Sequence, residues 1–407
     1  MKTFFILLFG TLLLANPLIF HPPKLSSPQE EIIAQFSEEI KHSSLKIALV
    51  MPKKIIGRYS VASIDTIMAY LSARGAEFEF EVFDSGDEEE ESIQKVYQEI
   101  TQHNFQFIIA IFTSKGAYQA SKLPLKIPLY IPTVNATQIG FDPSTNPMLF
   151  FGGISYKDQI RELLRLHTPD QNIIAYNDDS PVGDRLSNTL LDLIPNIHSQ
   201  TITNQDAATF SKQARTQEKL INQADVFLNT PVVKSGLLLS QIGYFRKKAS
   251  KFLSTQINYN PSIIVLTQKR DRKNLFIASS IAQTNQKLIE YGSLLNSDLK
   301  FDWVNYSTAL GMEMFYRIMF SDSLPYFKET IKNNQIQYTT QIYFIDTKGF
   351  FTPIDPSLLK TPPIEPQEVI PPILEPSGEG EIPQEEAEIP QEQSQEDKLS
   401  SDLILEG

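Results

Sequence analysis

The sequence predicts an α/β fold of two lobes, each built on a parallel-rich sheet. From Leu45 to about Pro353, short apolar strands alternate with amphipathic helices, as in parallel sheets covered by helices. The alternation comes in two successive sets, which meet near Gly152-Gly153. The chain of 407 residues contains no cysteine, so large hydrophobic cores must stabilise it in place of disulfides.

The first set opens with a strand at residues 46–50, which Pro52 ends. An amphipathic helix over residues 61–73 follows, and Gly75 stands at a suitable C′ position. The further expected elements are a strand at 78–83, a helix at 92–102, a strand at 107–112, a short helix at 115–120 and a strand at 128–134. The acidic run from Asp87 to Glu91 precedes a helix, where negative charge suits the macrodipole. We therefore predict a solvated helix start there and no metal site.

The second set begins with a strand at residues 149–151, followed by Gly152-Gly153 and a helix at 157–167. The remaining expected elements are a strand at 172–176, a helix at 181–194, a strand at 224–229, a helix at 233–244, strands at 251–256 and 274–279, a helix at 306–319 and a strand around 342–345. In the long last helix, the apolar spacing from Tyr306 to Phe315 favours a core face over a recognition face.

The N-terminal residues are typical of an export signal. Lys2 precedes an apolar run from Phe4 to Ala15, and Asn16-Pro17 breaks that run. We predict a signal peptide over residues 1–20 and a periplasmic protein, with an uncleaved anchor as the alternative. The run is shorter than the roughly 20 residues of a spanning helix, so no stable membrane span is expected after cleavage. Without cysteine, the chain lacks the acylation site of a lipoprotein. Residues 21–44 are expected to form a linker with a short helix.

The C-terminal segment carries the net charge of the whole chain. Residues 361–407 hold 13 acidic residues and a single basic one, Lys398, so residues 1–360 have no net charge. That balance argues against nucleic acid, or an anionic membrane surface, as a partner of the folded part. Dense proline and clustered glutamate predict a disordered tail over residues 356–407. The tail is either a solubilising spacer or a docking arm for an envelope partner, with apolar anchors such as Val369-Ile370 and Leu403-Ile404-Leu405.

The residue patterns argue against catalysis. The five histidines stand at positions 21, 42, 103, 167 and 198, and no two of them have the spacing of metal ligands. The chain has no Gly-x-Ser-x-Gly elbow, P-loop or dinucleotide fingerprint. The adjacent pair Asp178-Asp179 suits helix capping better than acid–base work. We expect a non-enzymatic protein without metal or other cofactor.

Several motifs, taken in order, resemble the type I periplasmic binding proteins, the family of branched-chain amino-acid binding proteins of ABC transporters. The resemblance spans roughly residues 45 to 353. It rests on Ile47-Ala48-Leu49-Val50-Met51-Pro52, on the strand and loop from Ile127 to Thr137, on Phe150-Phe151-Gly152-Gly153-Ile154-Ser155, and on the stretch from Ile173 to Gly183. It implies two Rossmann-like lobes with a hinge of three crossovers, and a ligand held between the lobes. The implied lobe 1 covers about residues 45–153 and 258–330, and lobe 2 about 154–257 and 331–355.

In open α/β sheets, ligands bind beyond the carboxyl ends of the strands, near helix N-termini. The side chains expected there are Tyr59, Ser60, Ser114, Thr133, Asn135, Thr137, Asp178, Asp179, Gln256 and Asn258. Amino-acid binders of the family hold the ligand ammonium with an acidic side chain. The corresponding loop here, residues 254–258, is neutral, and Val182 replaces a usual aromatic residue. An ammonium group without a counter-charge would be costly to bury.

These observations favour a protein-binding or regulatory envelope module built on the solute-binding fold. The alternative is an ABC-transporter-type binding protein for a small polar ligand.

Overall fold

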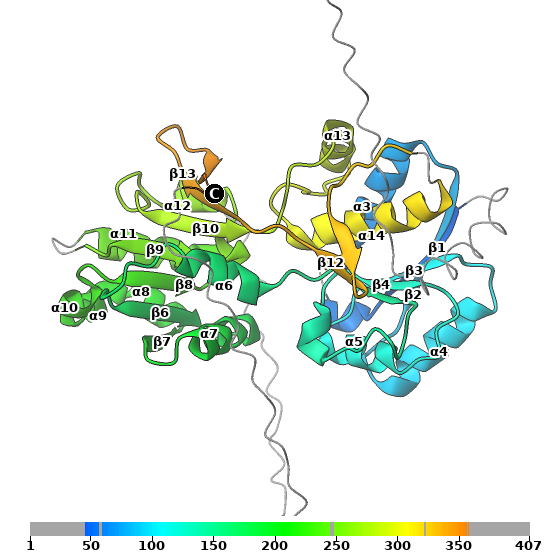
Figure 1. The fold of residues 1–407 in the computed structure, drawn as a ribbon, viewed down its shortest axis with the longest axis horizontal. Coiled ribbons are helices and arrows are strands. Elements are labelled where there is room, and N and C mark those ends of the chain that lie inside the picture. Colours follow the sequence, from blue (N-terminus) through cyan, green and yellow to red (C-terminus); the bar gives the residue numbers. More distant parts are fainter. Residues whose placement is uncertain (1–44, 57–58, 245–247, 321–322, 356, 358–407) are drawn as a thin grey trace, which may run out of the picture. The chain divides into compact units, whose positions relative to one another are not determined.

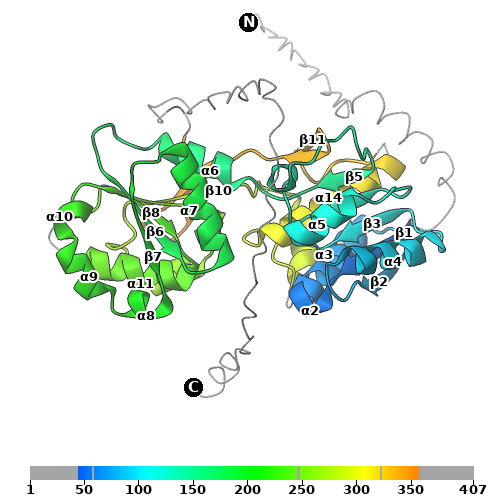
Figure 2. The ribbon, with the colours of Figure 1, turned by 90° about the horizontal axis from the view of Figure 1, so that it is seen from below.

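The computed structural model describes residues 45–56, 59–244, 248–320, 323–355 and 357. The predicted signal peptide, the linker over residues 21–44 and the tail from residue 358 onward lie outside the described residues. Figures 1 and 2 show the described part as two α/β lobes, each with its own sheet. The predicted fold class is confirmed.

The first lobe contains a seven-stranded sheet in the order β11-β12-β5-β4-β3-β1-β2. Its strands are β1 (Leu45–Met51), β2 (Phe78–Asp84), β3 (Phe107–Ala110), β4 (Leu129–Ile131), β5 (Leu149–Phe151), β11 (Thr330–Lys332) and β12 (Gln335–Gln337). All neighbouring pairs are parallel except the β11–β12 hairpin. In β1 only Lys46 is not fully buried, as expected of an inner strand that is covered on both faces.

Helices cover both faces of this first sheet. The helices of the lobe are α2 (Lys53–Ile56), α3 (Tyr59–Arg74), α4 (Glu90–Thr101), α5 (Ser114–Ser121), the 3₁₀ turn η1 (Ala136–Ile139), α13 (Gln286–Leu294) and α14 (Trp303–Met319). In Figure 1, α3 and α14 lie on one side of the sheet, and α4 and α5 lie on the other. A buried ion pair joins α3 to α14, between Arg74 and Glu313. The Arg74 guanidinium also lies 3.5 Å from the ring centre of Tyr326, which adds a cation–π contact.

The second lobe contains another seven-stranded sheet, in the order β14-β13-β10-β9-β8-β6-β7. Its strands are β6 (Ile173–Asp178), β7 (His198–Ile202), β8 (Asp225–Asn229), β9 (Lys251–Ser254), β10 (Leu275–Ser279), β13 (Gln341–Ile345) and β14 (Phe351–Pro353). The strands β7, β6, β8, β9 and β10 pair in parallel, whereas β13 and β14 are antiparallel.

The two faces of the second sheet are covered by different groups of helices, as Figure 2 shows. Helices α6 (Tyr156–Leu164) and α7 (Pro181–Leu193) pack on one face, through residues such as Leu163 and Leu186. The remaining helical segments are α8 (Asn204–Ala208), α9 (Phe210–Thr216), α10 (Glu218–Ile221), α11 (Val232–Gly243), the 3₁₀ turn η2 (Gln256–Asn258) and α12 (Ser262–Leu266). Residues of α8, α9 and α11 join the apolar cluster on the other face.

Two segments depart from the expected division into lobes. Strand β10 pairs with β9, so residues 275–279 belong to the second sheet and not to lobe 1. Strands β11 and β12 belong to the first sheet, although residues 331–337 were expected in lobe 2. The chain therefore changes sheets over residues 152–155, 280–285 and 338–340. An apolar pattern predicts a strand but not its partner, because pairing depends on contacts distant in sequence.

The first crossover passes between closely packed groups of the first lobe. A Cβ on Gly153 would overlap the backbone of Val134 and Asn135. The Gly153 carbonyl accepts hydrogen bonds from the side-chain amides of Asn135 and Gln335, at 3.0 and 3.1 Å. The Gly152 carbonyl accepts a bond from the Ser307 hydroxyl at 2.8 Å. Glycine is required at position 153 by this close approach of two backbone segments.

Candidate functional site

At the carboxyl edge of the first sheet, the N-terminus of helix α5 is occupied by a carboxylate of the protein itself. Thr113 is the N-cap of α5, and its hydroxyl accepts a hydrogen bond from the Lys115 N–H. The Glu88 carboxylate accepts a bond from the Thr113 N–H at 2.6 Å and another from the Thr113 hydroxyl. Glu88 is only 2% exposed. A helix N-terminus with a hydroxyl beside it is an anion site, and here Glu88 fills it.

The position of Glu88 corrects the prediction of a wholly solvated acidic run over residues 87–91. Its neighbours behave as predicted, since Glu89 and Glu90 are exposed and pair with Lys115 and Lys122 of the neighbouring α5 segment. Glu88 alone turns inward, next to Gly116. A Cβ on that glycine would lie 2.8 Å from a Glu88 carboxylate oxygen, so the small residue provides the space.

The predicted binding residues of the first lobe take part in the turns that follow its strands. Ser114 is the first residue of α5 and is half-buried. The Thr133 hydroxyl donates to the Phe112 carbonyl after β3. Asn135 caps η1, where its Oδ1 accepts bonds from the Thr137 N–H and hydroxyl at 3.1 and 2.7 Å. These groups therefore build the carboxyl edge of the sheet and hold the first crossover.

The other two predicted residues of this lobe are Tyr59 and Ser60. They are the first two residues of α3, the helix that follows β1 and α2. Their backbone thus lies in the expected helix start beyond a strand end, while the positions of their side chains fall outside the described structure.

In the second lobe, Asp178 and Asp179 share one lysine, which was not among the predicted site residues. Lys234 of α11 forms ion pairs with both carboxylates, at 2.5 Å to Asp179, and donates to the Ile202 carbonyl at 3.1 Å. Lys234 is 7% exposed. Burial favours its neutral form, but the hydrogen bonds and charges of the two aspartates outweigh burial and raise the pKa of Lys234 above its usual value.

The expected helix-capping role of the aspartates belongs to a different residue. Ser180 is the N-cap of α7, and its hydroxyl accepts the Gly183 N–H at 3.4 Å. Asp178 ends β6 and is buried, whereas the Asp179 side chain is 45% exposed. The hydrogen bond from Lys234 lowers the pKa of Asp179. The carboxyl edge of the second sheet thus holds a partly buried ion cluster with one cation and two anions.

Gln256 and Asn258 are buried and largely engaged with neighbouring groups. The Gln256 N–H donates to the Gln159 side-chain oxygen, and the Gln256 side-chain oxygen accepts the Ser280 N–H, both at 2.8 Å. The amide nitrogen of Asn258 donates to the hydroxyls of Ser235 and Ser254 at 2.8 Å. One amide atom of each residue, Nε2 of Gln256 and Oδ1 of Asn258, has no hydrogen-bond partner in the described structure.

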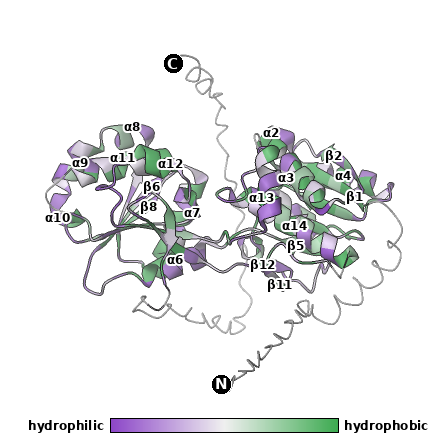
Figure 3. Ribbon diagram, turned by 90° about the horizontal axis from the view of Figure 1, so that it is seen from above, coloured by the Kyte–Doolittle hydropathy of each residue, from purple (hydrophilic) through white to green (hydrophobic). Residues whose placement is uncertain are grey.

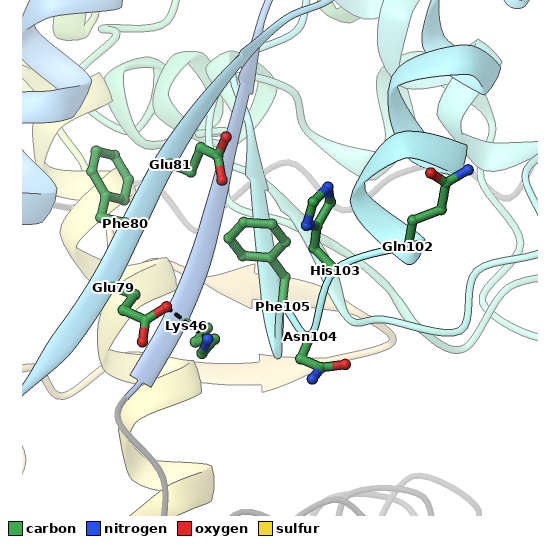
Figure 4. A pocket seen from close by; sticks show the side chains of 8 residues that line it. All are labelled: Lys46, Glu79, Phe80, Glu81, Gln102, His103, Asn104 and Phe105. Carbon is green, nitrogen blue, oxygen red and sulfur yellow. Dashed lines mark ion pairs between the residues drawn. The ribbon is translucent and has the colours of Figure 1, made fainter.

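A groove lies at the opposite edge of the first sheet, near the amino ends of β1, β2 and β3 (Figure 4). Its volume is about 470 Å³. The side chains lining it are Lys46, Glu79, Phe80, Glu81, Gln102, His103, Asn104 and Phe105. Two of these side chains, Lys46 of β1 and Glu79 of β2, form an ion pair of 2.7 Å. None of the predicted binding residues lines this groove, and it lies away from the edge where open α/β sheets usually bind ligands.

Three residues that shape the carboxyl edges were not predicted from the sequence: Glu88, Lys234 and Gln159. Glu88 was hidden within a run of charges that looked uniformly solvated. Lys234 is the single charged residue of the mainly apolar helix α11, and that isolation was a usable signal for a buried, paired cation. Gln159 is fully buried in the first turn of α6, between Gln256 and Ser280.

Two kinds of site have no support in the described part of the chain. In the described ranges, no three side chains of the metal-binding types come together. No helix there combines the length and apolar character needed to cross a bilayer.

Comparison with solved structures gives a likeness in fold without a likeness in sequence. No protein-family model matches the chain, and no curated protein matches it. An ABC transporter substrate-binding protein from Sphaerobacter thermophilus has a TM-score of 0.56 at 12% identity, over 77% of this chain and 96% of that one. A branched-chain amino-acid ABC transporter protein from Thermus thermophilus, with bound valine, has a TM-score of 0.54 at 14% identity, over 77% and 96%.

A third similar structure has a different described role. The C-domain of LpoA from Haemophilus influenzae, described as a regulator of PBP1A, matches with a TM-score of 0.50 at 10% identity, over 76% of this chain and all of that one. Identities of 10–14% establish the architecture alone. Together with the two seven-stranded sheets and three crossovers, they confirm that this chain has the fold of the type I periplasmic binding proteins.

Proposed function

We propose that this chain is a non-enzymatic, exported protein that uses the solute-binding fold as a protein-binding or regulatory module of the cell envelope. The observation that carries the proposal is the Glu88 carboxylate at the N-terminus of α5. It occupies hydrogen-bond donors that a free small carboxylate would need. A second carboxylate at the same place would meet the buried charge of Glu88 at close range, which is strongly unfavourable.

The chemistry of the second lobe supports the same proposal. A free amino acid also needs a carboxylate for its ammonium group. The buried Asp178 and the nearby Asp179 are both paired with Lys234. Gln256 and Asn258 are neutral and mostly satisfied by neighbouring groups. The likeness to LpoA, whose described role is regulation of another protein, is consistent with this use of the fold.

The proposed compartment is the periplasm, with residues 1–20 as signal peptide and no lipid anchor. The acidic tail is the proposed contact for an envelope partner, because its isolated apolar groups resemble short docking anchors. Deletion of residues 361–407 tests this part. Site-specific crosslinking in cells should lose a defined partner on deletion, and an unchanged set of crosslinked partners would rule out the docking arm.

A thermal-shift screen of the full chain tests the main proposal. Amino acids, short peptides and small carboxylates at millimolar concentration should leave the melting temperature unchanged. A tight ligand would stabilise the folded state by RT ln(1 + [L]/Kd), so one metabolite with a large and saturable shift would overturn the proposal.

That outcome would support the second candidate, an ABC-transporter-type binding protein for a small polar ligand. The observation in its favour is the pair of buried amide atoms without a partner, Gln256 Nε2 and Asn258 Oδ1, beyond the end of β9. Buried polar atoms usually have a hydrogen-bond partner, and a polar ligand would supply one. Gln256→Leu and Asn258→Leu would then abolish the shift.

A further inference from the structure

Helix α11 in the second lobe presents apolar side chains to solvent. Val233 is 57% exposed, and Leu237, one turn later, is 40% exposed. Tyr244, the C-cap, is 77% exposed. The charged residue of the helix, Lys234, points inward to its two aspartates. A surface helix normally exposes its polar side, whereas α11 has apolar residues on its exposed side as well as on its buried side, where Leu238, Leu239 and Ile242 lie.

The neighbouring helix α12 extends this apolar surface. Val265 is 86% exposed and Leu266 is 43% exposed. The two helices are in direct contact, since a Cβ on Gly236 of α11 would lie 3.0 Å from the Leu266 Cβ. In Figure 3 both helices carry much of the green that marks hydrophobic residues. We call the set Val233, Leu237, Tyr244, Val265 and Leu266 the α11–α12 surface.

Basic side chains border the α11–α12 surface near the C-terminal ends of its two helices. Lys269, Arg270 and Lys273 follow α12 and are exposed. Lys248 is exposed as well, and its amine donates to the Gly243 carbonyl at the end of α11. The acidic residue of the loop, Asp271, is 3% exposed and pairs with Arg270 at 3.2 Å. The border therefore carries a surplus of positive charge.

This local surplus is not visible in the charge balance of the sequence. Residues 1–360 have no net charge, which predicted no attraction to an anionic membrane. That prediction holds only for charges spread evenly over the surface. The loop that follows Leu266 gathers four basic residues within five positions, next to exposed apolar groups. Attraction to a charged surface depends on groups of neighbouring charges of this kind, because salt screens the interaction between charges more than about 8–10 Å apart.

We propose that the α11–α12 surface docks onto an anionic lipid surface. Projecting aliphatic and tyrosine side chains beside lysine and arginine are the groups that enter the boundary between lipid headgroups and acyl chains. An acidic peptide would instead need a groove for its apolar side chains. On the α11–α12 surface the apolar side chains stand outward, and Val265 is almost fully exposed. This proposal is independent of the proposed partner-binding role.

A site-specific fluorescence experiment tests the proposal on the full chain. The protein has no cysteine, so Val265→Cys introduces a single label site on the surface. Leu294→Cys is the matched control, because Leu294 is 77% exposed at the end of α13 in the other lobe. An environment-sensitive dye at position 265 should shift to the blue with vesicles of 70% phosphatidylcholine and 30% phosphatidylglycerol. The dye at position 294 should not shift, and pure phosphatidylcholine should have little effect at either position.

Charge-reversal variants sharpen the test. Lys269→Glu and Lys273→Glu together should weaken the response at position 265 by at least tenfold in lipid concentration, since each basic residue near an anionic surface contributes roughly fivefold. Lys300→Glu, an exposed lysine of the first lobe, should leave it unchanged.

Four outcomes would overturn the proposal. The first is an unchanged dye emission at position 265 with anionic vesicles, and the second is an equal emission shift at positions 265 and 294. The third is an emission shift at position 265 caused by the soluble tail peptide 361–407. The fourth is an emission shift that depends on protein concentration in the absence of lipid. The third would assign the surface to an acidic polypeptide, and the fourth to a second copy of the chain.

Discussion

The Glu88 carboxylate accepts hydrogen bonds from both the backbone N–H and the hydroxyl of Thr113, the N-cap of α5. The two residues are 25 positions apart and meet at the carboxyl edge of the first sheet. A polar position that a ligand could occupy in an open α/β sheet is thereby filled by a side chain of the same molecule. This relationship leads to the first prediction.

Glu88→Ala should open an anion site at the start of α5. The variant leaves the Thr113 N–H and hydroxyl without their acceptor, so unfolding should become easier by about 1–3 kcal/mol. Added acetate or sulfate should raise the melting temperature of the variant more than that of the wild type, because an anion can replace the lost carboxylate. Glu89→Ala, which removes an exposed ion-pair partner of Lys115, is the control and should show no such gain. Equal anion effects in all three proteins would contradict the internal-ligand role of Glu88.

Lys234→Met should strongly destabilise the second lobe. The substitution removes the cation that pairs with the buried Asp178, and an uncompensated buried charge costs about 3–5 kcal/mol. Denaturant unfolding measures the effect, with the exposed Lys212→Met as control. Adding Asp178→Asn to the Lys234 variant should restore part of the loss, because it removes the unpaired charge. A loss below about 1 kcal/mol would show that the ion cluster contributes little.

Asp179→Asn should reduce the sensitivity of the protein to acid. Because Lys234 lowers the pKa of Asp179 in the folded state, the ionised carboxylate stabilises that state above the ordinary value of 3.8. This contribution is lost as the pH falls through the lowered folded-state pKa. The free energy of unfolding, measured from pH 5 down to pH 2.5, should therefore fall less steeply in the variant. Asp184→Asn, an exposed carboxylate in the first turn of α7, is the control. Identical slopes in the variant and the wild type would contradict the pKa shift.

Gly153→Ala should cost about 3 kcal/mol of stability, through overlap of the new methyl group with the backbone of Val134 and Asn135. A backbone neighbour cannot rotate away as a side chain can. Gly86→Ala is the control, because Gly86 has a φ of 70° with open space around it. Its substitution therefore introduces backbone strain without steric overlap. That control should lose only about 1–2 kcal/mol. If the two variants lose the same amount, the packing at the first crossover is not the cause.

The elements themselves were largely predictable, because their signals are local. The strand at 46–50, the helix at 181–194 and the strand at 224–229 appear in the structure as β1, α7 and β8, within a residue or two. Strand β7 was missed because three of its five residues are exposed and polar. The short helices α8 to α10 were missed for a related reason, since each is too brief to show a repeated apolar face.

Assignment of residues to a sheet was less predictable. Strand β10 was expected as an element, but it was placed in the other lobe. The pairing of β12 with β5 joins Gln335 to Phe151, which are 184 positions apart, and no local pattern encodes such a contact. The ten predicted binding residues show a similar division. Their positions near strand ends were predicted from local patterns. Their hydrogen-bond partners, such as the Phe112 carbonyl for the Thr133 hydroxyl, come from other segments of the chain and were not predicted.

The sequence alone determined the two-lobe α/β architecture, the location of the net negative charge in residues 361–407 and the absence of disulfides, because composition and periodicity are properties of the chain itself. The tertiary structure decided which charged groups meet. Glu88 at α5, Lys234 between two aspartates, and the basic border of the α11–α12 surface each depend on residues brought together by folding. The energy of a charge depends on its burial and its partners within a few ångströms, and only the folded chain sets both.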